Sequence, residues 1–493
     1  MANNHKISEH LNSPIIKPPS YFGKFSIRLL FEYAKLFGWK KTITKVITRI
    51  FPKKEYKHTP STYAMVTSAL EIRSSIERNF SEIVNLDIFV SVIIPTYNAG
   101  PEFINLLKIL RKQEGVKKIE IVIVDSGSKD DTLQIAESFN VKVVKTPTEK
   151  FTHSYARNLG AKNATGDYYL FTVQDAFPPN TTWIYDMLQV IINNDVAAVS
   201  CAELPRENAD LFYRLLSWNH YKFLGINEND LIFSMPQKPD YISLRKNAQL
   251  SNLACLINGD IFNQFRYRRD YAEDLDLGLR LIQAGKKIAF MGSIRVIHSH
   301  SRPPFYFLKR GFVDNIFLAE MFSDFSIPKI TLCKLIPELV FTYQLLINVL
   351  DQLSLIGLPI KTSEFSTMLR NQFSKARSGP YPTTMPLLDE KYLDKESNVF
   401  LNNLMSGWGQ INAGKPYFGS FLPAFLEYVN IMLMYLISTY EFVYLDLLED
   451  IKACFFKVFC ILTGNYLAYC YLNKTYEDEE QLERLKVLLI EGV

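Results

Sequence analysis

Short apolar runs rich in β-branched residues alternate with helical patterns between residues 89 and 320, and this alternation constrains the fold more than any other feature. Such an alternation is typical of an α/β fold with a Rossmann-like, mostly parallel mixed sheet. Ligands of open α/β sheets bind beyond the carboxyl ends of the strands, so the residues that follow each run are the first candidates for a site. The predicted strands are Phe89 to Ile94, Ile119 to Val124, Val141 to Lys145, Tyr168 to Val173 and Val196 to Ala202.

Helical patterns separate the first four of these runs, over residues 101–113, 130–139 and 154–164. The rest of the chain differs from this α/β region, residues 89–320. Residues 1–88 read as a basic arm with amphipathic helices, and residues 321–493 as an all-helical C-terminal domain. The sequence therefore predicts three domains in 493 residues.

Charge and cysteine content exclude several classes of protein. The net charge of +4 gives no reason to expect nucleic-acid binding. The six cysteines lie far apart without a CxxC pair, which argues against a disulfide framework or a thiolate zinc site. We therefore expect a reducing compartment, the cytoplasm.

The basic charge is concentrated at the N-terminus. Residues 1–57 hold twelve Lys and Arg against three Glu, a balance of +9, so the rest of the chain carries −5. Within residues 21–51, aromatic and aliphatic side chains recur at helical spacing among Lys and Arg. Two interpretations stay open: a helix that binds the inner face of the cytoplasmic membrane, or a helix that packs on the body with a solvated basic face.

No signal peptide and no membrane span are predicted. The first twenty residues are polar, and the longest uncharged apolar stretches fall short of the roughly 20 residues that a span needs. We expect these stretches, Leu339 to Leu350, Tyr428 to Tyr440 and Val458 to Asn473, to be buried helices of a bundle.

The first two motifs follow neighbouring predicted strands. In VSVIIPTYN, Pro95 and Tyr97 end a strand and open a turn. In IVIVDSGSKDDT, Asp125 ends the next strand beside Ser126, and the small residues there let a ligand approach the backbone. A carboxylate in that place can accept a hydrogen bond from a base or ribose.

Two further motifs carry opposite charges. Arg157 in FTHSYARN falls early in a helix and could reach a diphosphate, although surface arginines are common. Gln174 and Asp175 follow an apolar strand in QDAFPPN. Mg²⁺ in proteins is held by only one or two carboxylates plus substrate phosphates, so a single Asp suffices for such a site.

The last two motifs are EDLDLGLR and HSH. Glu273 and Asp274 open an amphipathic helix. Acidic residues stabilise a helix N-terminus through the helix dipole, so they need no catalytic function there. A carboxylate at the edge of a cleft is equally what a general base requires. His298 and His300 point to one face in extended geometry and can ligate a metal or hold a phosphate.

Taken together, these six motifs resemble inverting, GT-A-fold family 2 glycosyltransferases, and the bacterial rhamnosyltransferase branch in particular. The resemblance covers about residues 88–310. It implies a GT-A catalytic domain. The sequence departs from the family pattern at one position, because Val173 stands where the first acid of the DXD motif is expected. No QxxRW motif is evident, so transfer of one or a few sugars is predicted, not polymerisation.

The resemblance implies a role for each matching residue. Glu273 and Asp274 match the ED motif, with Asp274 as catalytic base, and Asp175 matches the last acid of the DXD motif. His298 and His300 match a late histidine pair near a divalent metal, Mg²⁺ or Mn²⁺. The positions matching the nucleotide-sugar site are Pro95, Tyr97, Asp125, Ser126, Arg157 and Gln174.

The implied function is transfer of a sugar, rhamnose by the branch resemblance, from a dTDP- or UDP-linked donor. The implied acceptor is a hydroxyl of a bacterial surface glycan or lipid-linked carrier, and the implied location is cytoplasmic or peripheral at the inner membrane. A catalytically silent scaffold or glycan-binding protein with the same fold is the alternative. Homo-oligomerisation stays open.

Overall fold

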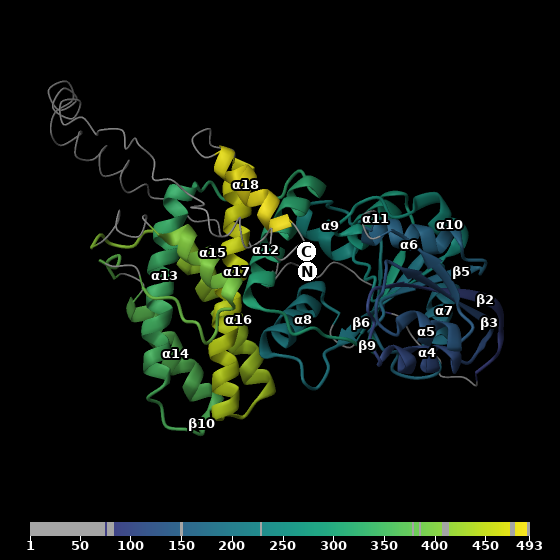
Figure 1. Ribbon diagram of the computed structural model, residues 1–493, viewed down its shortest axis with the longest axis horizontal. Helices are drawn as coiled ribbons and strands as arrows, with labels where there is room; N and C mark the ends of the chain where they lie inside the picture. The colour runs from purple at the N-terminus through teal and green to yellow at the C-terminus, as the bar shows by residue number, and fades with distance from the viewer. Residues whose placement is uncertain are drawn as a thin grey trace.

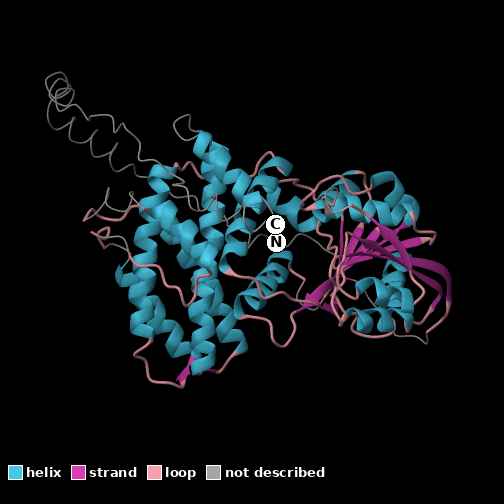
Figure 2. Cartoon of the chain, viewed as in Figure 1, coloured by secondary structure: helices cyan, strands magenta, loops and turns pink. Residues whose placement is uncertain are grey.

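The computed structural model describes residues 74–75, 83–147, 151–226, 229–376, 379–383, 386–406, 414–473 and 479–490. The basic amphipathic helix expected within residues 21–51, for which membrane binding and packing on the body are the two interpretations, lies outside these residues, as does nearly all of the predicted region 1–88. The described chain has a half that contains a large sheet and a half built of helices (Figure 1). Figure 2 shows the strands gathered almost entirely in the first half.

The large sheet has nine strands in the order β1-β7-β9-β6-β8-β5-β2-β3-β4. Pairing directions show that only β7 and β8 run against the other seven strands, so the predicted fold class, a mostly parallel mixed sheet, is confirmed. The strands are β1 Ser74–Ser75, β2 Leu86–Thr96, β3 Val116–Asp125, β4 Lys142–Lys145, β5 Tyr168–Thr172, β6 Ala198–Leu204, β7 Asp230–Phe233, β8 Ala254–Asn258 and β9 Ile288–Ile297.

Helices cover both faces of this sheet, which is why its central strands are apolar at successive positions. On β2, Val92 packs into a core with α4 (Phe103–Arg111) and α7 (Trp183–Asn194). Its neighbour Ile93 faces the opposite core, to which α10 (Gly259–Phe265) and α11 (Glu273–Gln283) contribute. The connections α5 (Thr132–Ser138) and α6 (His153–Lys162) complete the predicted alternation.

The helical half is one apolar core around the long helix α17 (Leu445–Asn473). Helix α8 (Leu211–Leu224) of the sheet half contributes to this same core. The other helices are α9 (Tyr241–Asn247), α12 (Pro304–Met321), α13 (Leu332–Leu353), α14 (Thr362–Ala376), α15 (Lys395–Met405), α16 (Phe421–Thr439) and α18 (Glu479–Ile490). A two-stranded pair, β10 (Ile360–Lys361) with β11 (Phe442–Val443), lies at one end.

Glycines let α12 and α17 approach closely. A Cβ atom on Gly464 would lie 1.9 Å from the carbonyl oxygen of Leu308, and one on Gly311 would lie 2.2 Å from that of Ile461. Real Cβ atoms do not approach so near, so both positions require glycine for this packing. Helix α12, which ends one residue past the predicted boundary at residue 320, thus packs directly on the helical half. The three-domain division stays a prediction.

Two described helices, α13 and α16, are long and apolar enough to cross a membrane by length and composition. In the structure, 72% of the 18-residue apolar window of α13 and 56% of that of α16 are buried inside the molecule. Their burial agrees with the expectation of bundle helices.

A buried carboxylate joins these two helices. Glu338 of α13 is 8% exposed, and its Oε2 accepts hydrogen bonds of 2.7 Å from the backbone N–H groups of Ser420 and Phe421 at the start of α16. Burial raises the pKa of Glu338 to about 7.

Candidate active site

One edge of the sheet collects the motif residues. Because β2, β3, β5, β6 and β9 point the same way, their carboxyl ends meet at that edge, and the antiparallel β8 begins there, with Ala254 opposite Thr172. The edge is therefore the place where an open α/β sheet binds its ligand.

The ends of β2 and β3 form a tightly bonded pair of turns. Asp125 is buried, and its Oδ2 accepts hydrogen bonds from the N–H groups of Gly127 at 2.9 Å and Ser128 at 3.0 Å. Its Oδ1 accepts from Thr96 Oγ1 at 3.2 Å. Ser126 is also buried and donates through Oγ to the Thr96 carbonyl oxygen. Here the Asp125 carboxylate shapes the loop after β3.

The turn after β2 is held by the amide of Gln174. Pro95 is buried within β2, opposite Val124 of β3. Tyr97 follows with its side chain exposed, while its backbone N–H donates to Gln174 Oε1 at 2.8 Å. The Gln174 Nε2 donates to the Tyr97 carbonyl oxygen at 3.2 Å. This pair of bonds presents the Tyr97 ring at the site edge.

Asp175, His298 and His300 form one cluster. Their ligand atoms all lie within 4.8 Å of one another. Asp175 Oδ2 lies 3.1 Å from His300 Nε2, and the two imidazole Nε2 atoms lie 3.2 Å apart. Burial lowers the pKa of His300, which favours the neutral ring that a metal needs. One carboxylate and two imidazole nitrogens that converge in this way fit a divalent cation.

Two residues that the sequence analysis missed, Glu203 and Tyr213, determine how His298 presents its nitrogen. His298 Nδ1 lies 3.2 Å from Glu203 Oε2 and 3.1 Å from the Tyr213 hydroxyl, which itself donates to Glu203 Oε2 at 2.9 Å. Both neighbours are therefore acceptors toward Nδ1, so this nitrogen carries the proton. The Nε2 lone pair is left facing Asp175 and His300.

Arg157 faces the ED motif. Its Nη1 lies 2.6 Å from Glu273 Oε1, with both side chains buried. Asn252, which the sequence analysis also missed, donates from Nδ2 to the same oxygen at 2.9 Å, and Tyr267 donates to Asn252 Oδ1 at 2.5 Å. The guanidinium predicted to reach a diphosphate is thus paired with Glu273, and this network fixes the first turn of α11.

Asp274 lies next to this network and is half-buried. Its Oδ1 accepts from the N–H of Leu275 at 2.8 Å, and its Oδ2 from the N–H of Asn252 at 3.3 Å. Burial and the charge of Glu273 raise the pKa of Asp274 to about 6. Ala272, the residue before the helix, has φ +51°, a left-handed conformation that side chains rarely adopt. A carboxylate with a pKa near neutrality on a strained helix start is suited to accept and release a proton.

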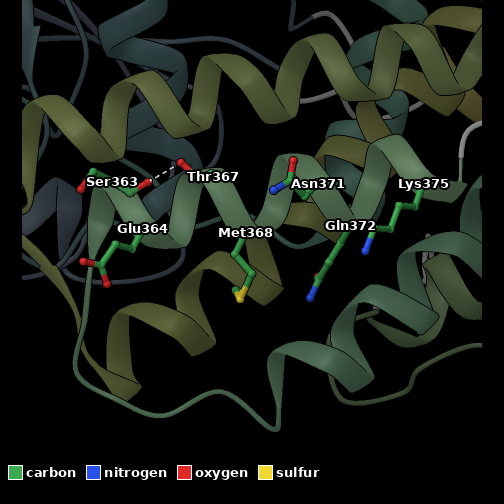
Figure 3. A pocket seen from close by; sticks show the side chains of 7 residues that line it. All are labelled: Ser363, Glu364, Thr367, Met368, Asn371, Gln372 and Lys375. Carbon is green, nitrogen blue, oxygen red and sulfur yellow. Dashed lines mark hydrogen bonds between the residues drawn. The ribbon is translucent and has the colours of Figure 1, made fainter.

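A separate hollow of about 650 Å³ lies along α14 in the helical half (Figure 1), and Figure 3 shows the side chains that line it. Its lining is mostly polar: Ser363, Glu364, Thr367, Met368, Asn371, Gln372 and Lys375.

Comparisons with known proteins agree with the motif analysis. The family model described as glycosyl transferase family 2 matches residues 91–253. The O-antigen chain rhamnosyltransferase RfbN of Salmonella typhimurium is 29% identical over 236 residues, which cover 47% of this chain and 72% of RfbN. The O-antigen chain rhamnosyltransferase WbaN of Salmonella anatum is 28% identical over 231 residues, 46% of this chain and 72% of WbaN.

Among solved structures, Staphylococcus aureus TarS 1-349 in complex with UDP-GlcNAc matches at 20% identity with a TM-score of 0.34. The match covers 46% of this chain and 65% of the TarS chain, just under two thirds of it. The family model and the rhamnosyltransferase relatives confirm the predicted resemblance.

Proposed function

We propose that this chain, a GT-A enzyme of glycosyltransferase family 2, transfers a sugar from a nucleoside-diphosphate donor to a hydroxyl of a bacterial surface glycan or its lipid-linked precursor. Rhamnose from a dTDP- or UDP-linked donor is our first candidate, because two relatives are named O-antigen chain rhamnosyltransferases. The observation that carries the proposal is the convergence of a candidate metal cluster and a raised-pKa carboxylate at one sheet edge.

We assign the metal site to Asp175, His298 and His300. Two imidazole ligands beside one carboxylate make a softer donor set than the all-oxygen set that Mg²⁺ prefers, so Mn²⁺ is the better candidate. A divalent metal there would neutralise the charge of the departing diphosphate. Asp175 would supply the oxygen ligand even though Val173 replaces the first acid of the motif.

We assign the base to Asp274. Its half-buried carboxylate would take the proton of the acceptor hydroxyl as that oxygen attacks the anomeric carbon from the face opposite the diphosphate, with inversion. We propose that Arg157 holds Glu273 in place and thereby helps to position the neighbouring Asp274, because its guanidinium is already paired with Glu273 in a buried contact. Pro95, Tyr97, Asp125, Ser126 and Gln174 would form the nucleoside side of the site.

The enzyme would act in the cytoplasm at the inner face of the membrane, where residues 21–51 could bind anionic lipid. The C-terminal helices would form a domain of their own.

The first experiment measures thermal stabilisation and calorimetric binding of dTDP, UDP and GDP to the purified full chain, with and without Mn²⁺. The expected result is stabilisation by one of the three diphosphates, and this stabilisation should weaken without Mn²⁺. The diphosphate that binds identifies the nucleobase of the sugar donor. Asp274→Asn should retain this binding while losing transfer. A well-folded chain that responds to none of the three would overturn the proposal and favour the scaffold alternative.

A further inference from the structure

Helix α8 connects the metal-cluster edge of the sheet to the helical half of the molecule (Figure 1). Leu211, Phe212 and Leu215 on this helix belong to the apolar core that is formed mainly by the C-terminal helices. The ring of Trp218 meets the ring of Tyr435 on α16 edge-on, with centroids 5.5 Å apart. The helical half therefore fixes α8, which also carries Tyr213 to His298.

Asp210 joins the two sides of this connection through a single carboxylate. Its Oδ1 accepts a hydrogen bond of 2.9 Å from the N–H of Tyr213 and caps α8. Its Oδ2 accepts a hydrogen bond of 2.8 Å from Nζ of Lys457 on α17. The two side chains are only 24% and 13% exposed, so loss of Lys457 would leave a carboxylate short of its partner in a partly dry place.

The hydroxyl of Tyr213 completes the chain of contacts. It orients Glu203 by donating to Oε2 at 2.9 Å, and it lies 3.1 Å from Nδ1 of His298. Partners that hold the far nitrogen of a ligating histidine fix its tautomer and its ring orientation.

We infer that Tyr213 and Glu203 are positioning residues for the metal ligand His298, and that α17 holds Tyr213 in place through the Lys457–Asp210 ion pair. The role presupposes the metal site of the proposed function. It gives the helical half a task in that site, although Lys457 itself touches neither Asp175 nor either histidine among the contacts that the structure describes.

The test titrates the full chain with Mn²⁺ and follows the electron paramagnetic resonance signal of the free aqueous ion, which needs no sugar substrate. Tyr213→Phe removes only the hydroxyl and should weaken Mn²⁺ binding roughly 10–100-fold, as is typical for outer partners of metal ligands. Lys457→Met should weaken it less, by about 2–30-fold, the range of remote coupling effects.

Lys452→Met is the matched control. Lys452 lies on the same helix, is similarly buried and pairs with Glu449 at 2.9 Å, but it is not bonded to α8. Lys452→Met should bind Mn²⁺ like the unaltered chain, and melting curves verify that each variant is folded.

Four outcomes are decisive. Weaker Mn²⁺ binding in both Tyr213→Phe and Lys457→Met, with unchanged binding in Lys452→Met, supports the inference. Unchanged binding in folded Tyr213→Phe refutes the positioning role, and equal binding in Lys457→Met and Lys452→Met refutes the part assigned to α17. If the unaltered chain binds no Mn²⁺, the proposed metal site fails, and the inference fails with it.

Discussion

Sugar transfer by this protein should decline as the pH falls below 6. A general base works only when deprotonated, and the pKa of Asp274 is raised from its ordinary 3.8 to about 6 by burial first and by the charge of Glu273 second. At pH 5 a base of pKa 6 is deprotonated to about 9%, whereas an unshifted carboxylate would be deprotonated to about 94%. The two cases thus differ by about tenfold in kcat at pH 5.

Glu273→Gln provides the perturbation. The amide oxygen can still accept hydrogen bonds from Arg157 and Asn252, but the negative charge beside Asp274 is gone. Burial remains the larger cause of the raised pKa. The acid limb of the pH–rate profile, which is the fall in kcat toward low pH, should therefore move below pH 6 without reaching pH 4. Each unit of displacement corresponds to about 1.4 kcal/mol of interaction between the two carboxylates.

The assay follows release of the nucleoside diphosphate at saturating donor and acceptor between pH 4.5 and 8. Asp274→Asn, which cannot titrate at this position, is the control and should show a low rate without this limb. A limb near pH 4 in the unaltered enzyme, or a limb that moves to higher pH in Glu273→Gln, would show that the reasoning about this pair is wrong.

Three further outcomes are expected. Asp274→Asn should lower kcat by about 10²–10⁴-fold while calorimetry shows unchanged donor binding; near-normal kcat would remove Asp274 from the mechanism. Gly464→Ala should destabilise the chain by about 1–3 kcal/mol in denaturant unfolding because its new methyl group meets the carbonyl of Leu308; Gly357→Ala, with nothing within 4 Å, is the control. Glu338→Gln should stabilise the chain by up to about 3 kcal/mol at pH 8 and have little effect at pH 4.5. The folded-state pKa of Glu338 lies near 7, above its ordinary 4.5, so the native carboxyl loses stability as the pH rises through that window; equal melting shifts at both pH values would contradict this.

The parallel part of the sheet could be predicted from the sequence because its signal is local. Runs such as Ile119 to Val124 are buried on both faces, and each ends in polar residues that the edge then brings together. The structure extends this strand to Val116–Asp125, a difference of a few residues. By contrast, β7, β8 and β9 were not predicted, because their pairing partners are remote in the chain and two of them reverse direction.

The same distinction applies to the site. Glu203 could have been found, because it directly follows the predicted strand Val196 to Ala202, as Asp125 follows its own strand. Asn252 and Tyr213 carry no such signal. Asn252 reaches the ED motif only because β8 runs antiparallel to β5, and Tyr213 reaches His298 only because the helical half fixes α8.

The contact between Lys457 and Asp210 spans 247 residues, and this has a consequence for synthesis on the ribosome. The residues of the sheet edge are all translated before residue 301, while the helix that braces α8 emerges at the end. At about 5–20 residues per second, Asp210 at the start of α8 waits about 12–50 seconds for Lys457 of α17. During this interval the face of α12 that later receives Gly464 has no partner. The proposed metal site would thus mature with the last long helix to be translated, and folding factors would have their longest access to the chain just before that moment.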